Sequence, residues 1–206
     1  MNPGFGLAPN EARVLTALLR VETPVTGRAV ARITGMTQST AQRALARLRE
    51  AGFVVAEPAP PSLLYRANTD HLAMPAMLAL LRIGDELRNR MAERIAQWPM
   101  RPVSVVIHGS VARGDATTGS DLDVLVVRSD ATEPDDPTWQ HQLAELADRV
   151  YRWTGKRASV IDMRRREAVE GLGDKEPFLV EAGRDGWLVA GQPLGELSSG
   201  CSSIPG

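Results

Sequence analysis

Two apolar stretches that enclose a glycine-serine pair and an Asp-Leu-Asp triplet constrain the fold of this chain most. Residues 105–127 read VVIHGSVARGDATTGSDLDVLVV. The apolar runs 103–108 and 122–127 predict two strands, and the run 158–162 predicts a third. Between the second and third strands, residues 137–153 open on a proline and predict a helix. Strands that alternate with helices in this way indicate an α/β domain.

The Asp-Leu-Asp triplet places two acidic side chains at the start of the second strand. Side chains alternate between the two faces of a strand, so Asp121 and Asp123 are predicted to share a face while Leu122 points to the core. Two carboxylates this close repel each other unless a cation lies between them. Mg²⁺ prefers oxygen ligands and completes its shell with water and substrate phosphate. Asp121 and Asp123 are therefore candidate metal ligands.

The glycine-serine pair has the chemistry of a phosphate cradle. Gly109 has no Cβ, so a triphosphate can approach its backbone closely. Ser110 offers a hydroxyl and an amide N–H at the start of a helical turn, and Arg113 adds a cation. We expect these three residues to bind nucleotide phosphates. His108 ends the preceding strand and is expected to pack beside the glycine rather than to bind a ligand.

The order of strand, Gly-Ser, spacer and Asp-apolar-Asp on the next strand resembles the signature of the DNA polymerase β-like nucleotidyltransferase superfamily. The form found here, GSVARGD followed by SDLDVLVV, is most similar to the minimal nucleotidyltransferases, which are often antitoxins. The resemblance covers about residues 100–190 and implies an α+β nucleotidyltransferase fold with a mixed sheet. It also implies transfer of a nucleoside monophosphate from an NTP, with ATP as the expected substrate, to a hydroxyl group, assisted by two Mg²⁺ ions.

The same superfamily uses a third carboxylate on a neighbouring strand, and Asp162 in ASVIDM is the best match in this chain. The resemblance implies that Asp162 joins Asp121 and Asp123 as a catalytic metal ligand and helps to deprotonate the acceptor hydroxyl. The alternative is that Asp162 caps a helix before Arg164–Arg166, a charge run that would itself be a solvated face.

The first seventy residues contain three helical segments and two short strands around a proline-rich turn at 58–61. Within them, GMTQSTAQRALARLREAGFV is similar to the helix-turn-helix of MarR-like bacterial regulators. Thr37 is expected to cap the recognition helix, whose first residues would reach base edges of DNA. The residues expected to contact DNA are Thr37, Gln38, Ser39, Thr40, Gln42, Arg43, Arg47 and, on the second wing strand, Arg66. The alternative is a winged helix that is used only for protein contacts.

The domain boundaries expected from the sequence are 1–70 for the winged helix-turn-helix, 71–99 for a linker helix, 100–190 for the nucleotidyltransferase domain and 191–206 for a disordered tail. The linker helix carries one apolar stripe. Its members are Met77, Leu80, Leu81, Leu87, Met91 and Ile95. The stripe could pack within the chain or form the seam of a homodimer.

Charge and composition agree with a DNA-binding module at the front of the chain. Residues 1–70 carry eight arginines and five acidic residues, whereas the whole chain has a net charge of −1, although chance also produces a difference of this size. The single cysteine, Cys201, excludes a disulfide within the chain. No apolar run is long enough for a membrane span and no signal-peptide pattern is present, so we expect a cytoplasmic protein.

Three functions fit these observations. The first is a DNA-binding nucleotidyltransferase whose acceptor is a protein side chain, for example on a toxin-like partner, or an RNA end or a small molecule. The second is a transcriptional regulator in which the nucleotidyltransferase fold senses nucleotide without turnover. The third is a DNA-bound antitoxin that acts only by protein contact.

Overall fold

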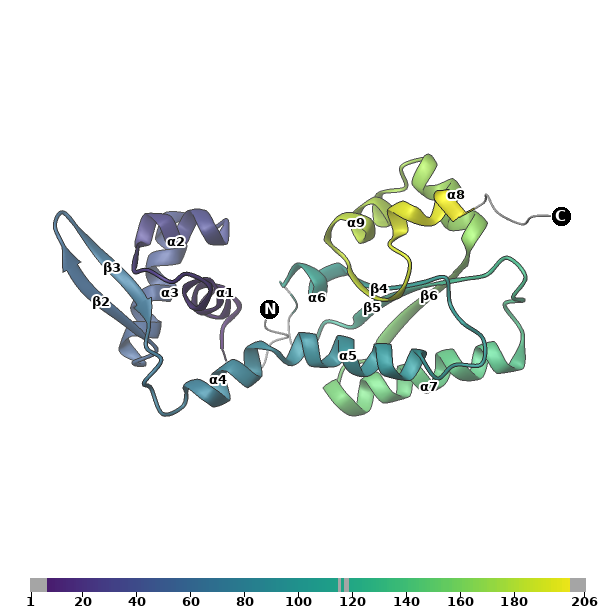
Figure 1. The fold of residues 1–206 in the computed structure, drawn as a ribbon, viewed down its shortest axis with the longest axis horizontal. Coiled ribbons are helices and arrows are strands. Elements are labelled where there is room, and N and C mark those ends of the chain that lie inside the picture. Colours follow the sequence, from purple (N-terminus) through teal and green to yellow (C-terminus); the bar gives the residue numbers. More distant parts are fainter. Residues whose placement is uncertain (1–6, 115, 117–118, 201–206) are drawn as a thin grey trace. The chain divides into compact units, whose positions relative to one another are not determined.

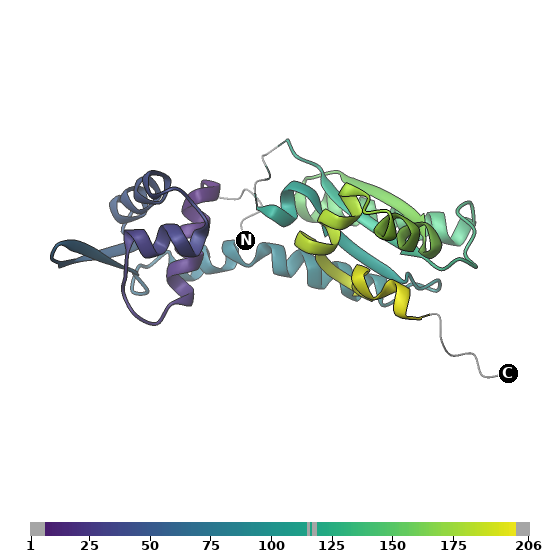
Figure 2. The same ribbon diagram turned by 90° about the horizontal axis from the view of Figure 1, so that it is seen from above.

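The computed structural model describes residues 7–114, 116 and 119–200. The chain divides into two compact units, Met1–Gly84 (unit 1) and Asp85–Gly206 (unit 2). Figure 1 and Figure 2 show unit 1 as a small group of helices with a hairpin, and unit 2 as a sheet with helices on both of its faces. Over these described stretches, no helix combines the length and apolar character needed to cross a membrane.

Unit 1 has the helices and the three-stranded sheet of a winged helix-turn-helix. Its elements are α1 Pro9–Arg20, β1 Val25–Thr26, α2 Gly27–Thr34, α3 Gln38–Glu50, β2 Val54–Ala59 and β3 Ser62–Ala67. The sheet order is β1-β3-β2, and both pairings are antiparallel. Thr37 caps α3, because its side chain accepts a hydrogen bond from the backbone N–H of Thr40. The predicted cap and the predicted wing hairpin are therefore both present.

The apolar spacing of the helices explains how unit 1 holds together. Ala41, Leu45 and Leu48 recur at helical spacing along α3, and each is at most 1% exposed. They pack against Leu15 and Leu18 of α1 in one hydrophobic cluster. This packing leaves the opposite, polar face of α3 open to solvent.

The segment predicted as one linker helix is two helices, α4 Met74–Leu81 and α5 Ile83–Ile95, with a break at Arg82. The predicted apolar stripe is divided between two cores. Met77 and Leu81 pack in the core of unit 1, and Leu87, Met91 and Ile95 pack in the core of unit 2. Because these five side chains pack within the chain, they give no support to a homodimer seam. Leu80, the sixth member of the stripe, is half-buried and belongs to neither cluster, and the homodimer stays a prediction.

Unit 2 is built on a mixed four-stranded sheet of order β6-β5-β4-β7. Its strands are β4 Ser104–His108, β5 Leu122–Arg128, β6 Ala158–Arg164 and β7 Trp187–Gly191. The pairs β4–β5 and β4–β7 are antiparallel, and the pair β5–β6 is parallel. The helices are α6 Gly109–Arg113, α7 Pro137–Thr154, α8 Arg165–Gly173, α9 Pro177–Asp185 and the 3₁₀ helix η1 Leu194–Gly200. The sequence predicts β4, β5, β6 and α7, and the mixed α/β class is confirmed.

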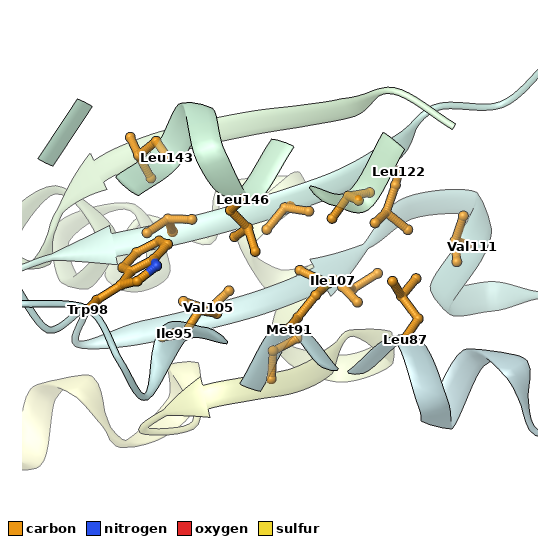
Figure 3. Close-up of a cluster of buried hydrophobic side chains, with 14 of the residues drawn as sticks. Leu87, Met91, Ile95, Trp98, Val105, Ile107, Val111, Leu122, Leu143 and Leu146 are labelled. Carbon is orange, nitrogen blue, oxygen red and sulfur yellow. The ribbon is translucent and has the colours of Figure 1, made fainter. Parts of the chain in front are cut away.

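Alternation along the strands gives the sheet two differently covered faces. Leu122, Val124 and Val126 of β5 face α5 and α7, in the cluster that Figure 3 shows. Leu125 and Val127 face α8, α9 and η1. Asp123 has the parity of Leu125 and Val127, so it belongs to the second face, and Asp121 immediately precedes the strand.

The C-terminal segment contributes to the core of unit 2. Leu194 and Leu197 of η1 are 3% and 0% exposed and pack with Leu179 of α9. The prediction of a disordered tail over 191–206 is therefore wrong for η1, because two leucines spaced three apart bury one side of the short helix. Residues 201–206 lie outside the described residues.

Candidate functional site

A sharp turn from strand to helix forms one side of the candidate site. β4 ends at His108, and α6 begins at Gly109, whose φ of +70° lies in the left-handed region that favours glycine. Ser110 and Arg113 follow on the single turn of α6. The three residues predicted to bind phosphate are thus gathered at the end of β4. Their binding of phosphate stays a prediction.

Asp123 lies directly against this turn. It is the antiparallel partner of His108 on the neighbouring strand. A Cβ on Gly109 would collide with the Asp123 carboxylate, so Gly109 makes room for an acidic side chain of the chain itself. Asp121 immediately precedes β5 and is exposed, while Asp123 is half-buried. The structure therefore brings Gly109 and Asp123 together, with Asp121 two residues before Asp123 in the chain.

Asp162 does not join this pair, and its predicted place beside Asp121 and Asp123 is wrong. In the parallel pairing of β5 with β6, Asp123 is opposite Ser159 and Val126 is opposite Asp162. Asp162 thus lies three residues further along, at about 3.3 Å per residue. An odd number of residues also reverses the face, so Asp162 projects toward α7 while Asp123 projects toward the α8 and α9 side.

The partners of Asp162 explain what it does instead. Its Oδ1 atom lies 2.9 Å from Nη1 of Arg128 in an ion pair whose side chains are only 17% and 5% exposed. The indole N–H of Trp139 donates a hydrogen bond of 3.2 Å to Oδ2 of Asp162. Arg128 also donates to the backbone carbonyl of Thr132. Asp162 therefore joins β5, β6 and α7, and it does not cap α8, whose N-cap residue is Arg164.

Ser159 occupies the place on β6 where a third carboxylate would lie beside Asp123. It is exposed, and it shares the Asp123 face with Ile161, which is 38% exposed. Sequence reasoning missed Ser159 and Trp139. The position of Trp139 on the apolar face of the 137–153 helix could have indicated that it packs against the sheet. No local pattern indicates Ser159, because its position beside Asp123 follows only from the register of the two strands.

Helix α9 lies over the strand-to-helix turn. Glu181 of α9 forms an ion pair with Arg113, and the ring of Phe178 lies 6.2 Å from the ring of His108. Burial lowers the pKa of His108 below its usual value, against the opposing effect of the negative charges on Asp123 and Glu181. His108 packs as predicted. Because of its ion pair with Glu181, the Arg113 guanidinium that is predicted to bind phosphate is held, at least in part, by a carboxylate of the chain.

The donor set fits one divalent cation bound together with phosphate. Within the described part of the chain, no three His, Cys, Asp or Glu side chains gather to hold a metal. Mg²⁺ commonly takes only one or two carboxylates and fills its other positions with water and substrate phosphates. Asp123, which lies against Gly109, and Asp121, two residues earlier, meet that requirement. The second Mg²⁺ ion expected from the sequence has no third carboxylate to bind it here, because Asp162 faces the other side of the sheet.

The residues predicted to contact DNA lie on the exposed side of α3 and on the wing of unit 1, yet several already have partners. Arg47 pairs with Glu11 at 3.1 Å, and Arg66 pairs with Glu57 at 3.1 Å. Gln42 accepts a hydrogen bond of 3.4 Å from the hydroxyl of Tyr65.

The first turn of α3 carries a group of linked hydroxyls. The Thr37 hydroxyl lies 3.1 Å from that of Ser39 and donates to that of Thr40 at 2.9 Å. Gln38 is exposed in the same turn. Arg43 is exposed one turn later, and its side chain makes no ion pair or hydrogen bond with any residue that the structure describes. Arg43 is therefore the side chain best placed to reach a phosphate without breaking an internal contact.

Comparison with known families finds one match in each unit. Residues 5–62 match the MarR family, and residues 85–170 match a nucleotidyltransferase domain family. Comparison with curated proteins finds no match.

Three of the solved structures with partial similarity to this chain differ in coverage and TM-score. A toxin-antitoxin complex with AMP-PNP is 16% identical, with a TM-score of 0.35, and the match covers 51% of this chain and 73% of that one. A protein from Sulfolobus solfataricus assigned as a nucleotidyltransferase is 23% identical, with a TM-score of 0.28, and the match covers 56% of this chain and 84% of that one. TrmBL2, an archaeal chromatin protein, is 17% identical, with a TM-score of 0.31, and the match covers 83% of this chain and 71% of that one.

Proposed function

Because the chain joins a MarR-family winged helix domain to a nucleotidyltransferase domain, we propose that it is a DNA-binding protein whose second domain binds an NTP with a divalent cation. The observation that carries the proposal is the seating of the Asp123 carboxylate against Gly109, next to Asp121 and the start of α6. This arrangement places anionic metal ligands beside backbone that a phosphate can approach.

Each residue of the site has a part in this binding. Asp121 and Asp123 would hold Mg²⁺, which when bound neutralises phosphate charge and orients the phosphate chain. Ser110 offers its hydroxyl and backbone N–H to phosphate oxygen. Arg113 adds a positive charge once its guanidinium turns from Glu181 toward the ligand. ATP is the expected nucleotide.

The position of Asp162 favours nucleotide sensing over nucleotide transfer. A transferase of this type needs a group that accepts the proton of the attacking hydroxyl. The residue of β6 that lies opposite Asp123 is Ser159, and a neutral serine is a poor base. We therefore infer that nucleotide binding regulates a DNA-bound protein, with little turnover by the isolated chain.

Nucleotide transfer is the second candidate, and a specific observation favours it. Gly109, Ser110, Asp121 and Asp123 are all present and gathered at one end of the sheet, as a transfer site requires. An acceptor that supplies its own base, on a protein partner, an RNA end or a small molecule, would complete such a site. An antitoxin role with a toxin-like partner belongs to this candidate and stays a prediction.

Two measurements on the full chain separate the candidates. DNA binding to the promoter of its own gene is measured with and without Mg²⁺ and ATP, and the sensing proposal expects the affinity to change at least several-fold. Incorporation of radiolabelled NTP into protein or RNA in a cell extract tests transfer. If the unsubstituted chain incorporates label and the Asp121→Ala/Asp123→Ala variant does not, the function is nucleotide transfer and the sensing proposal is wrong. An absence of nucleotide binding would contradict both.

A further inference from the structure

A buried lysine borders the acidic pair, and the site described so far gives it no part. Lys156 is 9% exposed. Moving an ammonium group out of water is costly unless hydrogen bonds or opposite charge compensate. Only two lysines occur in this chain, at 156 and 175, among 24 basic residues. Contact with water at the surface therefore does not explain a lysine at this buried position.

The local fold directs Lys156 toward the acidic pair. Helix α7 ends at Thr154, and its C-cap residue Gly155, with a φ of 69°, turns the chain. The backbone N–H of Lys156 then donates to the hydroxyl of Thr154 at 3.0 Å. The side-chain ammonium donates to the backbone carbonyl of Ser120 at 3.0 Å. Ser120 is the residue immediately before Asp121.

A second bond holds the other side of Asp121. The backbone N–H of Leu122 donates to the carbonyl of Arg157 at 2.8 Å. Residues 120 and 122 are thus fixed to residues 156 and 157, one by the lysine side chain and one by the backbone. The residue between the two bonds is Asp121. Its backbone has little freedom to move away from β5 while both bonds are present.

The ammonium group also suits the charge at this end of the sheet. Two carboxylates at the start of β5 repel each other when no cation is bound. A compact ammonium has three donors on a flexible stem, so it can bond a carbonyl where the broader, planar guanidinium of arginine would demand more room. A fixed positive charge one residue from Asp121 reduces the repulsion between the acids.

We propose that Lys156 is a positioning residue that holds Ser120 and thereby sets the position of Asp121 for cation and nucleotide binding. The inference rests on the proposed function for its purpose, but the positioning itself can be measured without any ligand. Lys156→Met keeps the length of the side chain and removes its charge and donors. Lys175→Met is the matched control, because Lys175 is the other lysine and is exposed.

Amide hydrogen exchange at Leu122, followed by NMR in the full chain without metal, tests the positioning. We expect exchange at least tenfold faster in Lys156→Met and unchanged in Lys175→Met. Exchange within twofold of the unsubstituted protein in both variants would overturn the proposal. Because a buried ammonium costs free energy, Lys156→Met is expected to keep its fold.

Binding of Mn²⁺ to the same proteins tests the purpose. Loss of a positive charge alone would strengthen cation binding, whereas loss of position weakens it. We expect affinity at least tenfold lower in Lys156→Met, and equal or tighter binding in that variant would overturn the proposal. If the unsubstituted chain binds no Mn²⁺, the proposed function fails, and the exchange rates alone decide the role of Lys156.

A measurement on the unsubstituted chain covers the case in which Lys156→Met does not fold. Selective ¹⁵N-lysine labelling gives one ammonium signal for Lys156 and one for Lys175. Mn²⁺ is expected to broaden the signal of Lys156 and to leave that of Lys175 sharp. Equal broadening of both signals, or of neither while Mn²⁺ is bound, would overturn the proposal.

Discussion

The carboxylate of Asp162 forms a 2.9 Å ion pair with Arg128 on the face of the sheet opposite Asp123. This pair, with the Trp139 indole as a further donor to Asp162, connects the end of β5, the strand β6 and the first turn of α7. Asp162, which the sequence suggested as a metal ligand, therefore stabilises the fold. Its removal and the removal of Asp123 should have different consequences.

The first prediction is that Asp162→Asn lowers stability. Removing one charge from a buried pair leaves the other uncompensated, so we expect the free energy of unfolding to fall by about 3 kcal/mol. Urea unfolding of the full chain, followed by tryptophan fluorescence, measures it. In the double variant Asp162→Asn/Arg128→Met part of the loss should return. A loss that is the same with and without Arg128 would show that the ion pair is not its cause.

The second prediction concerns Gly109. Alanine at a φ of +70° is strained, and its Cβ would meet the Asp123 carboxylate. Gly109→Ala should therefore displace Asp123 and weaken Mg²⁺-nucleotide binding at least tenfold in isothermal titration calorimetry. Gly173→Ala is the control, since a Cβ there meets no atom within 4 Å. Equal affinities in the two variants would remove Gly109 from the site.

The third prediction is that Glu181 competes with bound phosphate for Arg113. The pair is partly exposed, so its contribution is small, on the order of 0.2–1 kcal/mol. Glu181→Gln should raise nucleotide affinity by up to about fivefold, the factor that corresponds to the upper end of this range. Glu196→Gln, an exposed acid on η1, is the control for the change in net charge. A weaker affinity in Glu181→Gln would mean that Glu181 supports the ligand instead.

The fourth prediction concerns DNA. Arg43 has no internal partner among the described residues, whereas Arg47 must leave Glu11 to reach a phosphate. Arg43→Ala should weaken DNA binding and reduce the slope of log affinity against log salt by about one. Glu11→Gln should strengthen binding by releasing Arg47. Fluorescence anisotropy over a salt series checks both, with Arg152→Ala on α7 as the control. An unchanged slope in Arg43→Ala would exclude Arg43 from the interface.

Local patterns predicted much of the fold, because local chemistry determines them. The apolar run 122–127 predicted the strand β5 with Leu122 pointing to the core, and the Thr37 hydroxyl predicted the start of α3. The break at Arg82 was not predicted, since Met77 to Ile95 form one continuous stripe in the sequence. The break becomes visible only when the stripe is divided between two cores.

The error at Asp162 has a different physical cause. The sequence places an acid near the end of a predicted strand, but it does not state which residue of that strand lies opposite Asp123. A register change of one residue reverses the face of every side chain. The contact of α9 with Arg113 is likewise long-range, as it joins residues 113 and 181 through packing that no local pattern encodes.

The decisive measurement is the binding of Mg²⁺-ATP to Asp123→Asn and to Asp162→Asn, by calorimetry at a temperature where both are folded, because it compares the two faces of the sheet. We expect Asp123→Asn to lose binding by at least a factor of ten and Asp162→Asn to bind like the unsubstituted chain. Normal binding by Asp123→Asn together with loss of binding in folded Asp162→Asn would contradict it.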